Sequence, residues 1–104
     1  MYKALEYIES NYIRTILVEE IAACTGLSTD YFSRMFKHFT NLSPVEYIKN
    51  VRLAKAAELL RQPSMSVSQV ALEVGFEDPG YFSRQFKQTL GISPSQYQRD
   101  LGYL

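Results

Sequence analysis

The chain has 104 residues, which is enough for one domain or for two half-size lobes that share a core. Its single cysteine excludes an internal disulfide and fits a reducing compartment. No apolar run approaches the ~18 residues that a membrane span requires, so we expect a cytoplasmic protein. Eleven basic and eleven acidic residues cancel, and this balance argues against a nucleic acid as the partner, because domains that bind one are usually basic.

Apolar residues recur at spacings of three and four, and no stretch alternates in the manner of a strand. The sequence therefore predicts an all-α fold with seven helices. The first three are expected at residues 2–11, 18–25 and 29–40. Gly26 supplies a permissive backbone for the turn after the second helix. Ser28 is a good N-cap for the third, and Asn41 suits the left-handed conformation that ends it.

A long fourth helix is predicted over residues 44–61. Ser43 and Glu46 have the spacing of a capping box, and Pro44 stands at the first helical position. The apolar stripe of this helix consists of Leu53, Ala56, Ala57 and Leu60.

Three shorter helices complete the predicted chain. Ser66 and Gln69 form a second capping box that begins the fifth helix, and this helix ends at a turn around Gly75. Asp78 caps the sixth helix, with Pro79 as its first residue. The seventh helix begins with a third capping box, Ser93-Pro94-Ser95-Gln96, and we expect it to end near Leu101-Gly102.

Residues 18–48 and 67–98 carry the same pattern twice. The motif Tyr-Phe-Ser-Arg-x-Phe-Lys occurs at 31–37 and again at 81–87. The offset between the repeats is 49 residues up to the glycine of the turn and 50 after it, so one residue is inserted there. A short helix, a turn with glycine and a second helix are typical of a helix-turn-helix. A unit of this kind used twice predicts a protein that reads two stretches of DNA.

The repeats differ at the residue before their first helix. Leu17 stands where the second repeat has Ser66, and leucine has no side-chain oxygen with which to cap a helix. We therefore expect the helix at 18–25 to fray more than its counterpart.

The second helix of each repeat has an apolar face and a polar face. We expect the apolar faces, like most aromatic side chains of the chain, to lie in the core. The apolar face consists of Phe32, Met35, Phe36 and Phe39 in the first of these helices and of Phe82, Phe86 and Leu90 in the second. The polar faces both present Ser-Arg-x-x-Lys. Arginine can bind guanine through two hydrogen bonds, serine can bond to base edges, and lysine neutralises phosphate. Charged helix faces are usually only solvated, but recurrence in register favours the functional interpretation.

Charge is distributed unevenly along the chain. Residues 18–27 and 66–77 contain only acidic charges, whereas residues 49–62 contain four basic residues and one acidic residue. A neutral chain with this distribution can still present a positive face to DNA.

The same residues resemble a known family, the AraC/XylS-type transcriptional regulators, over essentially the whole chain. In the second half the matching residues are Val70-Ala71, Gly75-Phe76, Asp78-Pro79, Tyr81-Phe82-Ser83-Arg84, Phe86-Lys87, Gly91 and Ser93-Pro94. In the first half they are Ile21-Ala22, Gly26, Ser28, the run from Phe32 to Lys37, Ser43-Pro44 and Tyr47-Ile48. Arg52-Leu53, Ala56 and Leu59-Leu60 match in the connecting helix.

The resemblance implies two helix-turn-helix lobes, residues 1–43 and 62–104, joined by a linker helix at 44–61. Each lobe would place its second helix in a major groove of double-stranded promoter DNA. Eighteen helical residues span about 27 Å at ~1.5 Å each, comparable to the ~34 Å between successive turns of one groove. The family's sensor domain lies outside this region, so we expect the DNA-binding part of a longer regulator. We expect this part alone to be a monomer and dimerisation to depend on another domain of the regulator. Whether RNA polymerase is a second partner is left open.

By position, the resemblance also assigns site residues. Base contacts fall on Asp30, Ser33, Arg34, Gly80, Ser83 and Arg84. Phosphate contacts fall on Thr29, Lys37, Lys49, Tyr81 and Lys87. This chain departs from the family pattern where Asp30 would repel phosphate, where Gly80 has no side chain to read with, and where Gln98 replaces an arginine that many members carry.

The remaining residues point to no other chemistry. His38 has no metal-ligand partners at a suitable spacing, Cys24 has no neighbouring base, and no phosphate loop, carboxylate pair or nucleophile motif is present. The sequence therefore predicts neither an enzyme nor a cofactor. The alternative to DNA binding is a helical protein-interaction module, which the neutral charge favours and the retained arginines and lysines of both repeats disfavour.

Overall fold

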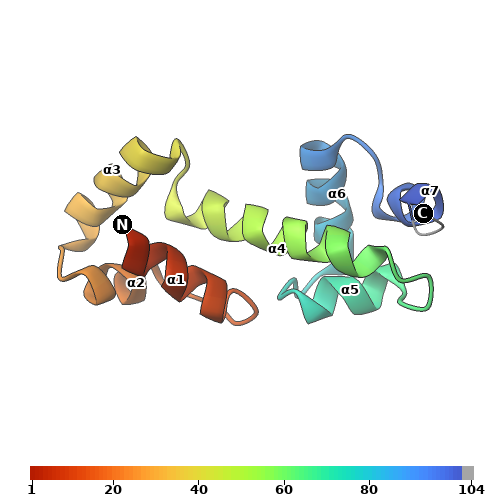
Figure 1. The fold of residues 1–104 in the computed structure, drawn as a ribbon, viewed down its shortest axis with the longest axis horizontal. Helices are drawn as coiled ribbons and strands as arrows, with labels where there is room; N and C mark the ends of the chain where they lie inside the picture. The colour runs from red at the N-terminus through yellow and green to blue at the C-terminus, as the bar shows by residue number, and fades with distance from the viewer. Residues whose placement is uncertain (102–104) are drawn as a thin grey trace. The chain divides into compact units, whose positions relative to one another are not determined.

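The computed structural model describes residues 1–101 and confirms the all-α prediction. Within this range the chain forms seven helices and no strand (Figure 1). They are α1 (Tyr2–Asn11), α2 (Val18–Thr25), α3 (Thr29–Thr40), α4 (Pro44–Leu60), α5 (Val67–Glu73), α6 (Pro79–Leu90) and α7 (Pro94–Leu101). Gly102, near which we expected the last helix to end, lies outside the described residues. No helix in the described part is long and apolar enough to cross a membrane.

The chain divides into two compact units, Met1–Val51 and Arg52–Leu104. In the first unit α1, α2, α3 and the start of α4 surround one core. Its buried residues are Ala4, Ile8, Ile21, Ala22, Phe32, Phe36 and Ile48. Tyr47 of α4 closes this core with its ring edge-on to Phe36, at 5.3 Å between centroids.

The second unit repeats this arrangement with a longer series of rings. Phe76, Phe82, Phe86 and Tyr97 follow one another with centroids 5.1–5.6 Å apart. The three phenylalanines are at most 5% exposed, as are Leu53, Ala56 and Leu60 of α4. Gln98 of α7 donates hydrogen bonds to the carbonyl oxygens of Gln62 and Met65, at 3.1 and 2.6 Å. The side chain that the sequence marked only as a missing arginine thus ties α7 to the loop that follows α4.

The turns and helix starts follow the sequence closely. Gly26, Gly75, Gly91 and Asn41 all have positive φ, between 63° and 101°. Both halves of the capping box form at Ser66 and Gln69. At Ser43 and Ser93 the serine oxygen caps the helix as predicted. The second bond of the capping box, from the backbone N–H of the serine to the side chain three residues later, differs at both places. The Glu46 carboxylate accepts from the Ser43 hydroxyl, and the Gln96 side chain is hydrogen-bonded to Asp100 and Arg99.

Two predicted core positions are wrong. Phe39 is 61% exposed and Leu90 is 42% exposed, although both continue the apolar stripes of their helices. Both lie in the last turn of their helices. Tyr31 and Tyr81, near the start of the same helices, are also exposed, as a phosphate contact at Tyr81 requires. Helix α4 ends at Leu60, one residue earlier than predicted.

The start of α2 is held by a network that the sequence did not reveal. Leu17 makes no side-chain cap, as expected. The carboxylate of Glu20 instead accepts hydrogen bonds from the backbone N–H of Leu17, the hydroxyl of Tyr7 and the guanidinium of Arg14, at 3.2, 2.7 and 2.8 Å. Hydrogen bonds from Arg14, Tyr7 and the Leu17 backbone lower the pKa of Glu20 from its ordinary 4.5 to about 2.

We predict that Glu20→Gln lowers the thermal stability at neutral pH and that this difference disappears in acid. The folded chain holds the pKa of Glu20 below its unfolded value, so the stabilisation is complete above about pH 5 and is lost as the pH falls from 4.5 towards 2. Thermal unfolding of both proteins between pH 7 and pH 2.5 measures it. Glu19→Gln is the matched control, because Glu19 lies in the same first turn but is exposed. Equal melting temperatures of wild type and Glu20→Gln at pH 7 would contradict the prediction.

Candidate nucleic-acid interface

Each unit contains a helix-turn-helix, and the second helix of each turns the corresponding side chains towards the core. In α3 the side chains of Phe32 and Phe36 are fully buried. Phe82 and Phe86 occupy the same places in α6 and are also fully buried. Because residues four apart lie on one face of a helix, these two anchors leave the opposite face of α3 and of α6 towards solvent. We call α3 and α6 the recognition helices.

The structure places most of the expected site residues on these outward faces. In α3 Asp30, Arg34 and Lys37 are exposed, and Thr29 and Ser33 are half-buried. The pattern repeats in α6, where Gly80, Tyr81, Arg84 and Lys87 are exposed and Ser83 is half-buried. Lys49 is the exception, since it lies on α4 and is half-buried. The structure thus brings ten of the eleven residues onto two helix faces, five on each.

The starts of the two recognition helices differ in the residue that caps them. Ser28 caps α3, and its hydroxyl accepts from the backbone N–H of Tyr31 at 3.3 Å. Asp78 caps α6, and its carboxylate accepts from the N–H of Gly80 at 2.9 Å. A helix start attracts phosphate through its free N–H groups and its positive dipole end. The Asp78 carboxylate occupies one of those groups in α6, whereas α3 has its acidic residue, Asp30, inside its first turn. Each helix start thus carries one carboxylate, and the two differ in the charge of the capping residue.

The arginines of the two faces have different neighbours. The guanidinium carbon of Arg34 lies 6.0 Å from the centroid of the Tyr31 ring, within the range of a cation–π contact. The guanidinium of Arg84 lies over Gly80, where a Cβ atom would stand 3.5 Å from its Nη1. Tyr31 was missed by sequence reasoning as a site residue. Its position three residues before Arg34, outside the stripe of Phe32 and Phe36, is the signal that could have found it.

Arg52 of α4 belongs to the interior of the second unit. Burial lowers the pKa of its guanidinium, and the charge of Glu77 partly offsets this effect. Arg52 is half-buried. A partly desolvated arginine near an acidic residue serves packing and charge balance inside the unit, so Arg52 is less accessible to a polyanion than the exposed Arg34, Lys37, Arg84 and Lys87.

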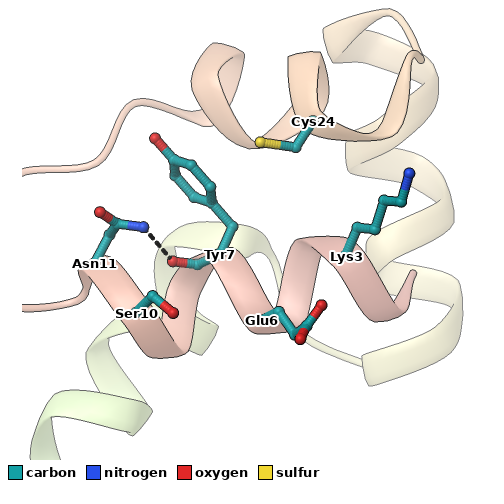
Figure 2. Close-up of a pocket in the computed structure, with 6 residues that line it drawn as sticks. All are labelled: Lys3, Glu6, Tyr7, Ser10, Asn11 and Cys24. Atoms are coloured by element: carbon teal, nitrogen blue, oxygen red, sulfur yellow. Dashed lines mark hydrogen bonds between the residues drawn. The ribbon is translucent and has the colours of Figure 1, made fainter.

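The described residues also contain an open hollow, between α1 and α2. It has a volume of about 380 Å³ and is lined by Lys3, Glu6, Tyr7, Ser10, Asn11 and Cys24 (Figure 2). Two of its polar side chains are already engaged, because Tyr7 bonds to Glu20 and Asn11 donates to the Tyr7 carbonyl. Cys24 is exposed, as is Glu73, which holds the same place in the second repeat. No cluster of three or more His, Cys, Asp or Glu that could hold a metal occurs within residues 1–101.

Comparison with known proteins agrees with this geometry. A model of the helix-turn-helix domain family matches residues 21–100. The crystal structure of a probable AraC family transcriptional regulator from Rhodopseudomonas palustris is 32% identical, with a TM-score of 0.87 over 96% of this chain and 94% of that one. The DNA-binding domain of AdpA, solved with a target DNA, is 27% identical with a TM-score of 0.87 over 95% of this chain and 89% of that one.

Among curated proteins, the lactose operon transcription activator of Staphylococcus xylosus is 33% identical over 73% of this chain. The match spans 27% of that activator's length. Several other relatives are regulators matched over a similar share, about a quarter of their length. The similarity therefore concerns one part of these longer proteins, the part that contains the two helix-turn-helix motifs.

Proposed function

Because the chain belongs to the AraC family of helix-turn-helix transcriptional regulators, we propose that it reads promoter DNA with α3 and α6 in adjacent major grooves. It is a DNA-binding domain of this non-enzymatic family. The observation that carries the proposal is the outward Ser-Arg-x-x-Lys of both recognition helices, held in register by the same pair of buried phenylalanines.

Each outward residue has a role that its chemistry supports. Arg34 and Arg84 bind guanine, and Ser33 and Ser83 bond to neighbouring base edges. Asp30 accepts a hydrogen bond from cytosine N4. Gly80 has no side chain, so it presents only its main-chain atoms to a base. The phosphate contacts are Thr29, Lys37, Lys49, Tyr81 and Lys87.

The proposal extends to the protein around this domain. The chain corresponds to about a quarter of the curated regulators it matches, so we assign it to a longer cytoplasmic regulator whose dimerisation lies in another domain. The fragment alone then binds as a monomer. RNA polymerase is a second partner of the longer protein in this scheme.

The first experiment is the selection of duplexes from a randomised DNA library by this fragment, followed by gel shifts at two salt concentrations. Recovery of a common motif supports the proposal. If no sequence is enriched and no gel shift occurs at low salt, the proposal of DNA binding fails. The alternative function, a helical protein-interaction module, which the neutral charge favours, then remains.

We predict weak, monomeric binding with a shallow salt dependence. Each phosphate contact contributes about −0.9 to the slope of log K against log salt, and the chain offers few cations for such contacts. Fluorescence anisotropy on the selected duplex measures the slope, and sedimentation of the complex gives its stoichiometry. Lys37→Ala should make the slope about 1 shallower, while Lys3→Ala on α1 serves as the control. A slope steeper than about −8 would contradict the prediction.

We predict that Arg34→Ala and Arg84→Ala relax sequence preference at two different places, about one helical turn of DNA apart. Each should cost ~1–3 kcal/mol on the best duplex, as expected for an arginine bound to guanine through two hydrogen bonds. Repeating the selection with each variant locates the positions. An equal loss of affinity on every sequence would instead make that arginine a phosphate contact.

We predict that the two halves of the selected site carry unequal information. Helix α3 presents Thr29 and Asp30 near its start, whereas α6 presents Pro79 and Gly80. With fewer side chains there, α6 leaves base reading to Ser83 and Arg84. The half assigned to α3 by the Arg34→Ala selection should therefore be longer. Equal information content in both halves would overturn this asymmetry and leave DNA binding intact.

A further inference from the structure

The two recognition helices follow turns that end differently. In the second unit the N–H of Phe76 donates to the carbonyl oxygen of Ala71 at 2.9 Å, which closes the turn through the backbone. Phe76 is 5% exposed and packs on Phe82. In the first unit the N–H of Leu27 donates to the Thr25 hydroxyl at 3.3 Å, and Leu27 is 37% exposed. The residue that follows the turn glycine is therefore a buried ring in one unit and a half-exposed leucine in the other.

This difference changes the neighbour of the tyrosine that opens each recognition helix. The Tyr81 ring packs against Phe76, with centroids 6.1 Å apart. Leu27 offers no ring to Tyr31, and the Tyr31 ring instead lies beside Arg34. Among the described residues, no corresponding contact joins Arg84 to Tyr81.

Arg84 has a different support. A side chain on a helix leans towards the helix start and covers the residue four positions earlier. For Arg84 that residue is Gly80, and the guanidinium lies where side-chain atoms of a larger residue would extend. A Cβ at Gly80 would stand 3.5 Å from Arg84 Nη1 and 3.3 Å from the Asp78 carboxylate oxygen.

We propose that the two base-reading arginines are positioned by different residues, Arg34 by the ring of Tyr31 and Arg84 by the open space at Gly80. Tyr31 and Gly80 thereby set specificity through the arginines, and neither uses a side chain of its own to bond to a base. The inference rests on the proposed function for its effect on DNA, and on the chain alone for its geometry.

The geometry of Arg34 is tested without DNA. Side-chain protons of an arginine near a ring face are shifted upfield by the ring current, so the NMR signals of Arg34 should move downfield in Tyr31→Leu and stay in place in Tyr31→Phe. Tyr81→Leu is the matched control, and it should leave the Arg84 signals unmoved. Arg34 signals that do not respond to Tyr31→Leu would overturn the proposal for the first unit, whether or not the chain binds DNA.

The effect on reading is tested on the duplex selected by the wild-type chain and on versions substituted at the bases that depend on Arg34. Tyr31→Leu should reduce discrimination between these duplexes about two- to fivefold, the range of an exposed cation–π contact. Tyr31→Phe should keep it. In the Arg34→Ala background Tyr31→Leu should have no further effect on discrimination. An equal loss on every duplex with Tyr31→Phe would identify the tyrosine hydroxyl as a phosphate contact and overturn the positioning role.

Gly80→Leu tests the second unit. Leucine is a better helix former than glycine, so the variant should fold, which circular dichroism checks. Its side chain fills the space of the Arg84 guanidinium, and discrimination at the Arg84 bases should fall about fivefold. Gly80→Ala adds one atom 3.5 Å from Arg84 Nη1, an ordinary contact distance, and 3.3 Å from the Asp78 carboxylate oxygen, which has to shift by a few tenths of an ångström. Its discrimination at the Arg84 bases should stay within twofold of wild type. Nuclear Overhauser contacts between Gly80 Hα and the Arg84 side chain should be present in the wild-type chain without DNA. Their absence, or unchanged reading by Gly80→Leu, would overturn the proposal for Arg84.

Discussion

Burial of two phenylalanines one helical turn apart controls how each recognition helix can be used. Phe32 and Phe36, like Phe82 and Phe86, are completely buried. Rotating either helix by one residue would bring at least one ring into water, at a cost of about 1.5–3 kcal/mol for each ring. That cost is large against the few kcal/mol of net stability typical of small domains. The orientation of Arg34, Lys37, Arg84 and Lys87 is therefore a consequence of packing on the opposite side of the helix.

The turns carry a second constraint, because they set where each helix begins. Gly26 and Gly75 have φ of 75° and 101°, a conformation that side chains rarely adopt. The repeats tolerate one extra residue immediately after this point. The packing of the turn also differs, since Phe76 is buried and Leu27 is not, yet the same phenylalanines point inward in both units. Variation at the turn thus alters the surroundings of the first helical residues and leaves the rotation of the helix unchanged.

The helices, the turns and the outward faces could be predicted from the sequence because they depend on local features. Periodic phenylalanines, glycines at the turns and serine or aspartate at the helix starts act within a few residues. The errors came from long-range features. Phe39 and Leu90 continue their stripes but are exposed in the last turn of their helices, and a stripe gives a direction without saying whether another element covers it. The bond of Gln98 to Met65 spans 33 positions, and no local pattern announces it.

The two units also differ in how independent their first helices are. Helix α5 is capped by its own Ser66 and Gln69, so the N–H groups at its start need no partner from a distant part of the chain. Helix α2 takes its N-terminal partners from α1 and the segment after it, through Tyr7 and Arg14. For protein engineering this makes α5–α6 the more portable reading module. A graft of α2–α3 must carry residues 1–16 with it, or must exchange Leu17 for a residue that can cap.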